Sequence, residues 1–303
     1  MLTILISAGS LIAIIILGYV LKRCGFFSMD DFSTISKLII KITLPCAVIT
    51  NFDKIQVETG LLWIAIIGIA CNLIMSGFGY FLHRKHSPAE KAFAVVNFSG
   101  YNIGSFAMPY VQSFLGPLGI LSVCIFDSGN SIMCTGSTYS LAVGIKGNEK
   151  PTVKAFLSRT LSSIPILTYV TMMILSICRI HLPEFVLSFA DVVGKANPFL
   201  AMMTLGIAFE IHLSKDKVKQ LLQMLFVRYG ISVLLALSFF FLLPFPLEIR
   251  QGLVLISFAP ISGLCTLFTE KIDGDVHFSG TISSISIVLS VAIMTSLMLW
   301  MQG

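Results

Sequence analysis

Apolar residues along this chain form long runs that are separated by short polar stretches. Ten runs lie near residues 3–21, 34–52, 61–82, 92–114, 118–145, 155–178, 186–211, 219–243, 250–270 and 277–301. A run of about 20 apolar residues has the length of a helix that crosses the hydrocarbon core of a bilayer. The pattern therefore predicts an all-α integral membrane protein with about ten transmembrane helices.

Four of these runs are interrupted by prolines that lie in matching places of the two halves of the chain. Pro45 and Pro198 lie in the second and seventh runs, and Pro109 and Pro260 lie in the fourth and ninth. Proline lacks a backbone donor and clashes with the preceding turn, so each is predicted to break its helix. Lipid cannot satisfy the freed backbone groups, so such breaks are buried in protein or line a wet cavity. Paired interruptions indicate the substrate site of a secondary transporter.

The two halves are predicted to form an inverted repeat. Corresponding prolines are about 150 residues apart, and each half holds five runs. Because five is an odd number, the second copy must lie upside down in the membrane. We divide the chain into a first five-helix repeat, residues 1–145, a cytoplasmic linker, 146–154, and a second repeat, 155–303.

Basic residues are distributed unevenly among the polar stretches. The stretches after runs one, three, five and seven hold most of the loop lysines and arginines, whereas those after runs two, four, six and eight hold one or none. Basic loops face the cytoplasm, and an even number of spans then places both termini outside. We therefore predict a multi-pass protein of the cytoplasmic (inner) cell membrane.

Composition excludes several other classes of protein. Hydrophobic residues make up 56% of the chain and charged residues 12%, with a mean hydropathy of +0.92, whereas soluble domains carry about 25% charged residues. The net charge of +5 lies in loops, so it concerns orientation in the bilayer rather than nucleic acid. The sequence has no GxxxxGK[ST], HExxH or GxSxG motif, and its seven cysteines form no CxxC pair. We expect no enzyme activity, no cofactor and no metal.

The chain also carries short motifs spread over its whole length. They are residues 18–27, residues 41–45, Asn102-Ile103-Gly104, Met108-Pro109, Asn130, Gly194, Pro198, Leu205-Gly206-Ile207 and Ala259-Pro260. In this order and spacing they resemble the auxin efflux carrier family, of the bacterial type that is related to the plant PIN-type exporters.

The resemblance implies two inverted five-helix repeats in which helices four and nine cross at their breaks. It implies a scaffold of spans 1, 2, 6 and 7, a moving transport unit of spans 3–5 and 8–10, and a small organic anion as substrate. In PIN-type exporters an asparagine shortly before the span-four proline contacts the substrate, and Asn102 is the matching position. Those exporters carry a further proline where this chain has Cys265, so the second crossing differs in detail.

Both breaks are predicted to contribute to an anion site. A half-helix that starts at a break has N–H groups without intrahelical partners, and these carry partial positive charge. Polar side chains near the breaks are predicted to add donors, namely Asn97, Asn102, Ser105, Ser262 and Thr266. For the hydroxyls the alternative is hydrogen bonding within or between helices.

Asp127 lies inside the fifth run, and an ionisable residue within the membrane is a functional hypothesis by default. It is a candidate carrier of a coupling proton, and the alternative is a structural hydrogen bond. Asn130 follows three residues later on the same helical face, so we predict that it lines the same cavity and contacts substrate.

Lys41 and Lys195 precede the prolines of the second and seventh runs by four and three residues. They are candidates for attracting the substrate anion from the scaffold side. The alternatives are snorkelling to the interface and, for Lys195, an ion pair with Asp191 one turn earlier.

The sequence predicts a secondary transporter that moves a small organic anion, auxin-like or a mono- or dicarboxylate such as malate or malonate, by an elevator-like alternating-access mechanism. Two alternatives stay open: a sodium- or proton-coupled carrier of the bile-acid transporter type, and a non-transporting membrane sensor with the same fold. Assembly as a homodimer also stays open. Beyond the lipid bilayer and the anion, we expect no nucleic-acid partner.

The predicted orientation can be tested with Lys85→Cys, Lys150→Cys and Gly303→Cys, each compared with the unsubstituted chain. A membrane-impermeant thiol reagent added to intact cells should label position 303 and leave positions 85 and 150 unlabelled, because the basic loops are expected in the cytoplasm. Labelling of position 150 from outside would contradict the assignment.

Overall fold

A computed structural model describes residues 2–53, 58–147 and 162–302, and this part of the chain is almost entirely helical. Its α-helices are α1 (Leu2–Arg23), α2 (Met29–Leu38), α3 (Leu44–Asp53), α4 (Trp63–Leu82), α5 (Pro88–Phe98), α6 (Met108–Gln112), α7 (Pro117–Ile132), α8 (Thr138–Lys146), α10 (Ile164–Ile177), α11 (Glu184–Gly194), α12 (Asn197–Ala208), α13 (Val218–Leu242), α14 (Leu247–Ser257), α15 (Leu264–Lys271) and α16 (Val276–Gln302). Short 3₁₀ or π-helical segments are η1 (Ile39–Thr43), η2 (Thr59–Leu62), η3 (Ile103–Ala107), η4 (Met133–Ser137) and η5 (Lys215–Lys217).

The structure confirms the all-α membrane fold. Within the described ranges, seven helical segments are long and apolar enough to cross a membrane. The fourth and ninth runs appear as broken helices, α5 with η3–α6 and α14 with α15, whose halves are too short to span alone. The sixth run is represented by α10, and its first part lies outside the described residues, as does most of the predicted linker. The inverted relation between the halves stays a prediction.

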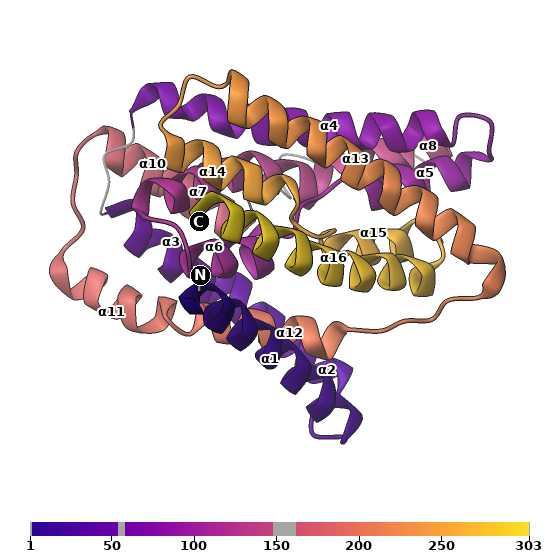
Figure 1. Ribbon diagram of the computed structural model, residues 1–303, viewed down its shortest axis with the longest axis horizontal. Helices are drawn as coiled ribbons and strands as arrows, with labels where there is room; N and C mark the ends of the chain where they lie inside the picture. Colours follow the sequence, from indigo (N-terminus) through magenta and orange to yellow (C-terminus); the bar gives the residue numbers. More distant parts are fainter. Residues whose placement is uncertain (1, 54–57, 148–161, 303) are drawn as a thin grey trace.

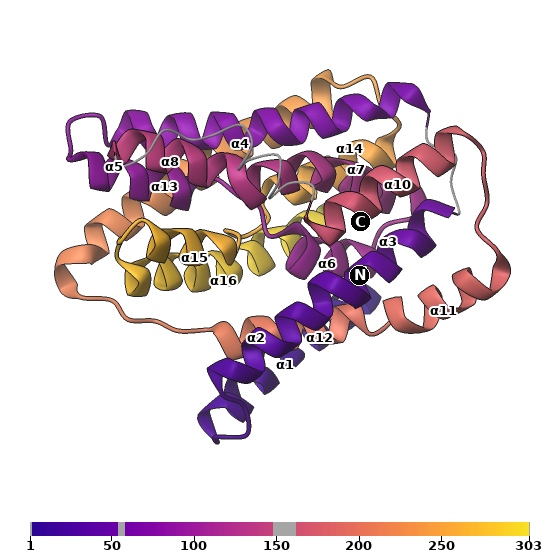
Figure 2. The same cartoon turned by 180° about the vertical axis from the view of Figure 1, so that it is seen from behind.

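Helix contacts divide the described chain into two groups. One group, which we call the scaffold group, contains α1, α2, α3, α10, α11 and α12, and the other, the transport group, contains α4–α8 and α13–α16. Figures 1 and 2 show α4 and α13 along one edge of the molecule and α1, α2 and α12 at the opposite edge. The division matches the one that the family resemblance implies.

Two of the predicted proline breaks are instead π-turns. Leu44 N–H bonds to Ile39 O and Met108 N–H bonds to Ile103 O, five residues back, so a widened turn directly precedes both Pro45 and Pro109. A proline ring clashes with the carbonyl four residues earlier, and a π-turn opens the helix by one residue at that point. The helix therefore continues through both prolines, which corrects the predicted break positions.

The remaining two prolines lie at interruptions of the helix. Pro198 is in the first turn of α12, directly after the gap between α11 and α12, and Pro260 lies between α14 and α15. Proline suits the start of a helix because the first N–H groups have no intrahelical partner.

Glycine allows close helix packing in both groups. A Cβ at Gly68 of α4 would lie 2.4 Å from Phe126 O, and one at Gly129 of α7 would lie 1.9 Å from Ala65 O. In the scaffold group, Gly18 of α1 and Gly206 of α12 face each other's helix in the same way. Small residues let backbones approach closely, and this packing holds helices together where lipid gives no hydrophobic driving force.

An ion pair joins the ends of α1 and α12. Lys22 Nζ lies 2.5 Å from Glu210 Oε1, and this hydrogen bond lowers the pKa of Glu210 below its usual value. The stabilisation is therefore present at neutral pH and is lost as the pH falls through the lowered pKa. The Glu210 side chain is 43% exposed, so solvent screens the pair and its contribution is small.

The α4–α7 contact can be tested by Gly129→Ala. The added methyl group would collide with Ala65 O, and overpacking of this kind costs about 1–3 kcal/mol. We expect a lower melting temperature in detergent. The control is Gly230→Ala in α13, where a Cβ would meet nothing within 4 Å. Equal melting of Gly129→Ala and wild type would show that the contact is looser than described.

Candidate functional site

The two broken helices meet at their breaks. After α5 ends, Gly100 adopts φ +79°, a conformation that favours glycine, and η3 starts at Ile103. Tyr101 forms an isolated antiparallel bridge with Ile261, and Asn102 N–H donates to Pro260 O at 2.9 Å. The predicted crossing of helices four and nine is thus confirmed, with direct backbone contact between the breaks.

Two buried amides satisfy the backbone at the first break. Asn72 Oδ1 accepts from Gly100 N–H at 2.8 Å. Asn130 donates to Tyr101 O at 2.9 Å and accepts from Tyr101 N–H at 3.1 Å, as a neighbouring strand would do. Asn72 Nδ2 also donates to Asn130 Oδ1, which joins the two side chains. Asn130 therefore stabilises the unwound backbone of the crossover by binding both backbone groups of Tyr101.

Arg228 satisfies the carbonyls at both breaks. It belongs to α13 and is 1% exposed. Its guanidinium donates to Phe98 O, to Gly100 O at 3.0 Å and, at the longer distance of 3.5 Å, to Ala259 O. Its charge therefore lies against the carboxyl-terminal ends of both first half-helices, where the helix dipole is negative.

Besides Asn130, three of the predicted binding side chains are engaged inside the protein. Asn97 donates to Phe93 O and to Thr269 Oγ1, both at 2.9 Å, and accepts from Ser279 Oγ. The same serine hydroxyl lies 3.3 Å from Thr266 Oγ1, and since its one hydrogen goes to Asn97 it accepts from Thr266. Asn97 and Thr266 thus belong to a polar cluster that joins α5, α15 and α16.

The third engaged side chain is Ser262, whose Oγ accepts from Leu264 N–H at 3.4 Å where α15 begins. For Thr266 and Ser262 this is the helix-bonding alternative that the sequence left open.

Asn102 and Ser105 are placed differently. Both are partly exposed, and neither side chain has a hydrogen-bond partner within the described part of the chain. Asn102 is the residue before η3, and Ser105 lies within it. The segment η3 contacts α12 of the scaffold group, so this part of the transport group adjoins the scaffold. Among the predicted binding residues, these two are the ones whose side chains remain available to a ligand.

The chain is similar in sequence to membrane transporters. Residues 3–150 match the model of a family described as membrane transport protein, and residues 197–302 match the sodium bile acid symporter family. An uncharacterized transporter of Methanothermobacter thermautotrophicus is 23% identical over 298 residues, which cover 96% of this chain and 95% of that relative. The chain is a membrane transporter. The matches support its resemblance to the auxin efflux carriers, and each matched region contains one of the two breaks.

In this transporter Asp127 joins the two helix groups. It is 4% exposed, accepts from Tyr169 Oη at 2.6 Å and accepts from Asn130 Nδ2 at 2.8 Å. Tyr169 lies on α10 of the scaffold group, whereas Asp127 and Asn130 lie on α7 of the transport group. A sliding movement between the groups must therefore break the hydrogen bond between Tyr169 and Asp127.

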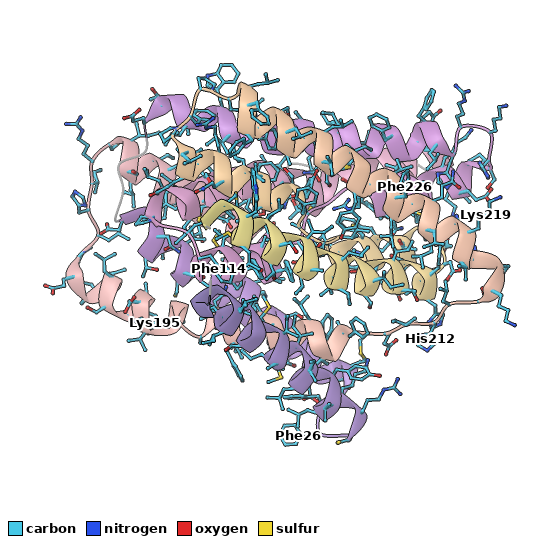
Figure 3. All side chains as sticks on the ribbon, viewed as in Figure 1. Phe26, Phe114, Lys195, His212, Lys219 and Phe226 are labelled. Atoms are coloured by element: carbon cyan, nitrogen blue, oxygen red, sulfur yellow. The ribbon has the colours of Figure 1, made fainter. Side chains whose placement is uncertain are left out.

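Lys41 and Lys195 have no described bond to the crossover. Both are exposed, and Lys195 pairs with Asp191 at 2.5 Å, the alternative that the sequence offered. Figure 3 shows Lys195 at the outer edge of the molecule, near the junction of α11 and α12. Attraction of the substrate by these lysines stays a prediction.

Sequence reasoning missed Asn72 and Arg228. Each is a polar or charged residue in the interior of an apolar run, and for the ionisable Arg228 that position is a functional hypothesis by default. Their hydrogen-bond partners could not be predicted, because the carbonyl and amide groups that they bind belong to segments far away in the chain.

The bond between the groups can be tested with Tyr169→Phe and Asp127→Asn, alone and combined. Removal of the Tyr169 hydroxyl leaves a buried acceptor without its donor, so melting in detergent should occur at lower temperature. In a double-mutant cycle we expect a coupling of about 1–3 kcal/mol. Tyr80→Phe, at an exposed tyrosine of α4, is the matched control. Additive effects of the two changes would show that no such bond forms.

Proposed function

We propose that this transporter moves a small organic anion, an auxin-like compound or a mono- or dicarboxylate such as malate or malonate, by alternating access. The observation that carries the proposal is the crossover, where two helices are interrupted in the middle of the transport group and their breaks bind each other. Interruptions of this kind occur where backbone is buried in protein or lines a cavity, and paired ones mark the substrate site in secondary transporters.

The charge distribution at the crossover favours an anion. Arg228 lies against the negative ends of α5 and α14. The second half-helices, η3–α6 and α15, begin at the same place with N–H groups that carry partial positive charge, roughly half an elementary charge for each helix. A carboxylate complements these ends, and Asn102 and Ser105 supply further donors beside the first of them.

An elevator-like movement fits the division into two groups. Asn72, Asn130 and Arg228, which hold the crossover together, come from α4, α7 and α13 of the transport group. The site is therefore built within one group and faces the other through η3 and α12. A shift of the transport group against the scaffold would carry the intact site from one side of the membrane to the other.

Coupling to an ion is the second candidate, because residues 197–302 match the sodium bile acid symporter family. In that case the substrate moves together with a cation, and Asp127 is the candidate carrier if that cation is a proton. The sidedness of the loops and a location in the cytoplasmic membrane remain part of the proposal.

The binding site can be tested by Asn102→Ala, with the purified protein screened against mono- and dicarboxylates in a thermal-shift assay. A ligand that binds the native state raises the melting temperature by mass action. We expect a carboxylate to stabilise the wild type, and about tenfold higher concentrations to be needed for the variant, because a donor to a charged group is lost.

The control is Asn51→Ala on α3, where the amide bonds its own helix, to Ala47 O, among the described residues. It should respond like the wild type. Equal stabilisation of the Asn102 variant would place the site elsewhere, and the absence of stabilisation by any carboxylate would contradict the proposed substrate class.

A further inference from the structure

Arg228 is a buried charge without a buried counter-charge. It lies near the middle of α13, a helix of 25 residues that is apolar enough to span the membrane, and is 1% exposed. Throughout the described residues no carboxylate lies within ion-pair distance of its guanidinium. Burial of an ion in this way is costly unless other groups replace its hydration. The groups that do so here are backbone carbonyls.

These carbonyls form a cation site that the protein fills with its own side chain. Phe98 is the last residue of α5, Gly100 follows it, and Ala259 follows the end of α14. Unwound backbone carbonyls and half-helix carboxyl ends are the groups that coordinate Na⁺ in transporters with broken helices. The planar guanidinium offers five N–H donors, so it can serve several carbonyls at once. The Tyr101 ring, with its centroid 5.2 Å from the guanidinium carbon, covers the guanidinium.

We propose that Arg228 is the permanent cation of the crossover and takes the place of a coupling Na⁺ or K⁺. The crossover is then assembled without a bound metal ion, and neither ion is needed for the substrate site to form. This inference rests on the proposed function in one respect, that the crossover is the substrate site. It predicts that removal of the guanidinium leaves a carbonyl-lined site that accepts a small monovalent cation.

The test uses the purified full-length protein, its Arg228→Ala and Arg228→Lys variants, and melting temperature as the readout. Wild type should melt at the same temperature in the chlorides of sodium, potassium and N-methylglucamine at equal ionic strength. Arg228→Ala should melt lower, and millimolar guanidinium or Na⁺ should restore part of the loss, because each can occupy the vacated carbonyls. Arg228→Lys keeps the charge and should stay insensitive to the choice of salt.

The matched control is Arg250→Ala. Arg250 also donates to a backbone carbonyl, Phe240 O at 2.7 Å, but near the start of α14 and away from the crossover. No cation-specific recovery is expected there. If Arg228→Ala does not fold, two other measurements serve. One is the yield of folded Arg228→Ala when it is expressed with guanidinium, and the other is the melting temperature of Arg228→Lys in the three salts.

Uptake of labelled malonate into liposomes separates this inference from the proposed function. Uptake by the wild type that requires Na⁺, or no recovery of Arg228→Ala by any cation, would overturn the role of Arg228 while transport of an anion stands. The absence of malonate and other carboxylate uptake in every salt would count against the proposed function. The cation response in the melting assay would still decide the role of Arg228.

Discussion

The fold depends on one constraint, that backbone interrupted at membrane depth must find partners inside the protein. At the crossover Asn102 N–H bonds to Pro260 O, Asn130 binds both backbone groups of Tyr101, and Arg228 binds the carbonyls where α5 and α14 end. Three helices of the transport group, α4, α7 and α13, supply side chains to these breaks. The close glycine contacts between α4 and α7 then bring Asn72 and Asn130 within reach of each other.

The carbonyl ends and the amide ends at the crossover have different surroundings. The carbonyl ends are neutralised by a side chain, whereas the amide ends adjoin two polar side chains, Asn102 and Ser105, that remain available. Of the two second half-helices, the one that begins with η3 contacts α12 of the scaffold group. The hydrogen bond from Tyr169 to Asp127 crosses the same boundary, so it stabilises one relative position of the two groups.

The sequence was sufficient for the all-α membrane class and for the crossing of two broken helices, whereas the count of ten spans and the inverted repeat stay predictions. It was insufficient where the same residue type is compatible with two local structures or with two kinds of partner. Pro45 and Pro109 follow π-turns rather than breaks, since one extra residue in the turn relieves the ring clash. Asn97 and Asn130 were predicted to contact substrate, yet both are used by the protein, because their partners come from distant helices. Arg228 was overlooked for the same reason.

The central claim is that the crossover moves as part of one body, and a distance measurement by electron spin resonance tests it most directly. One label pair joins the groups, at Val192 of α11 and Phe226 of α13, and a second pair lies within the transport group, at Phe81 of α4 and Phe226, all three positions being exposed. Addition of a transported carboxylate should change the distance distribution of the first pair and leave the second unchanged. A change within the second pair, or none in the first, would contradict the account.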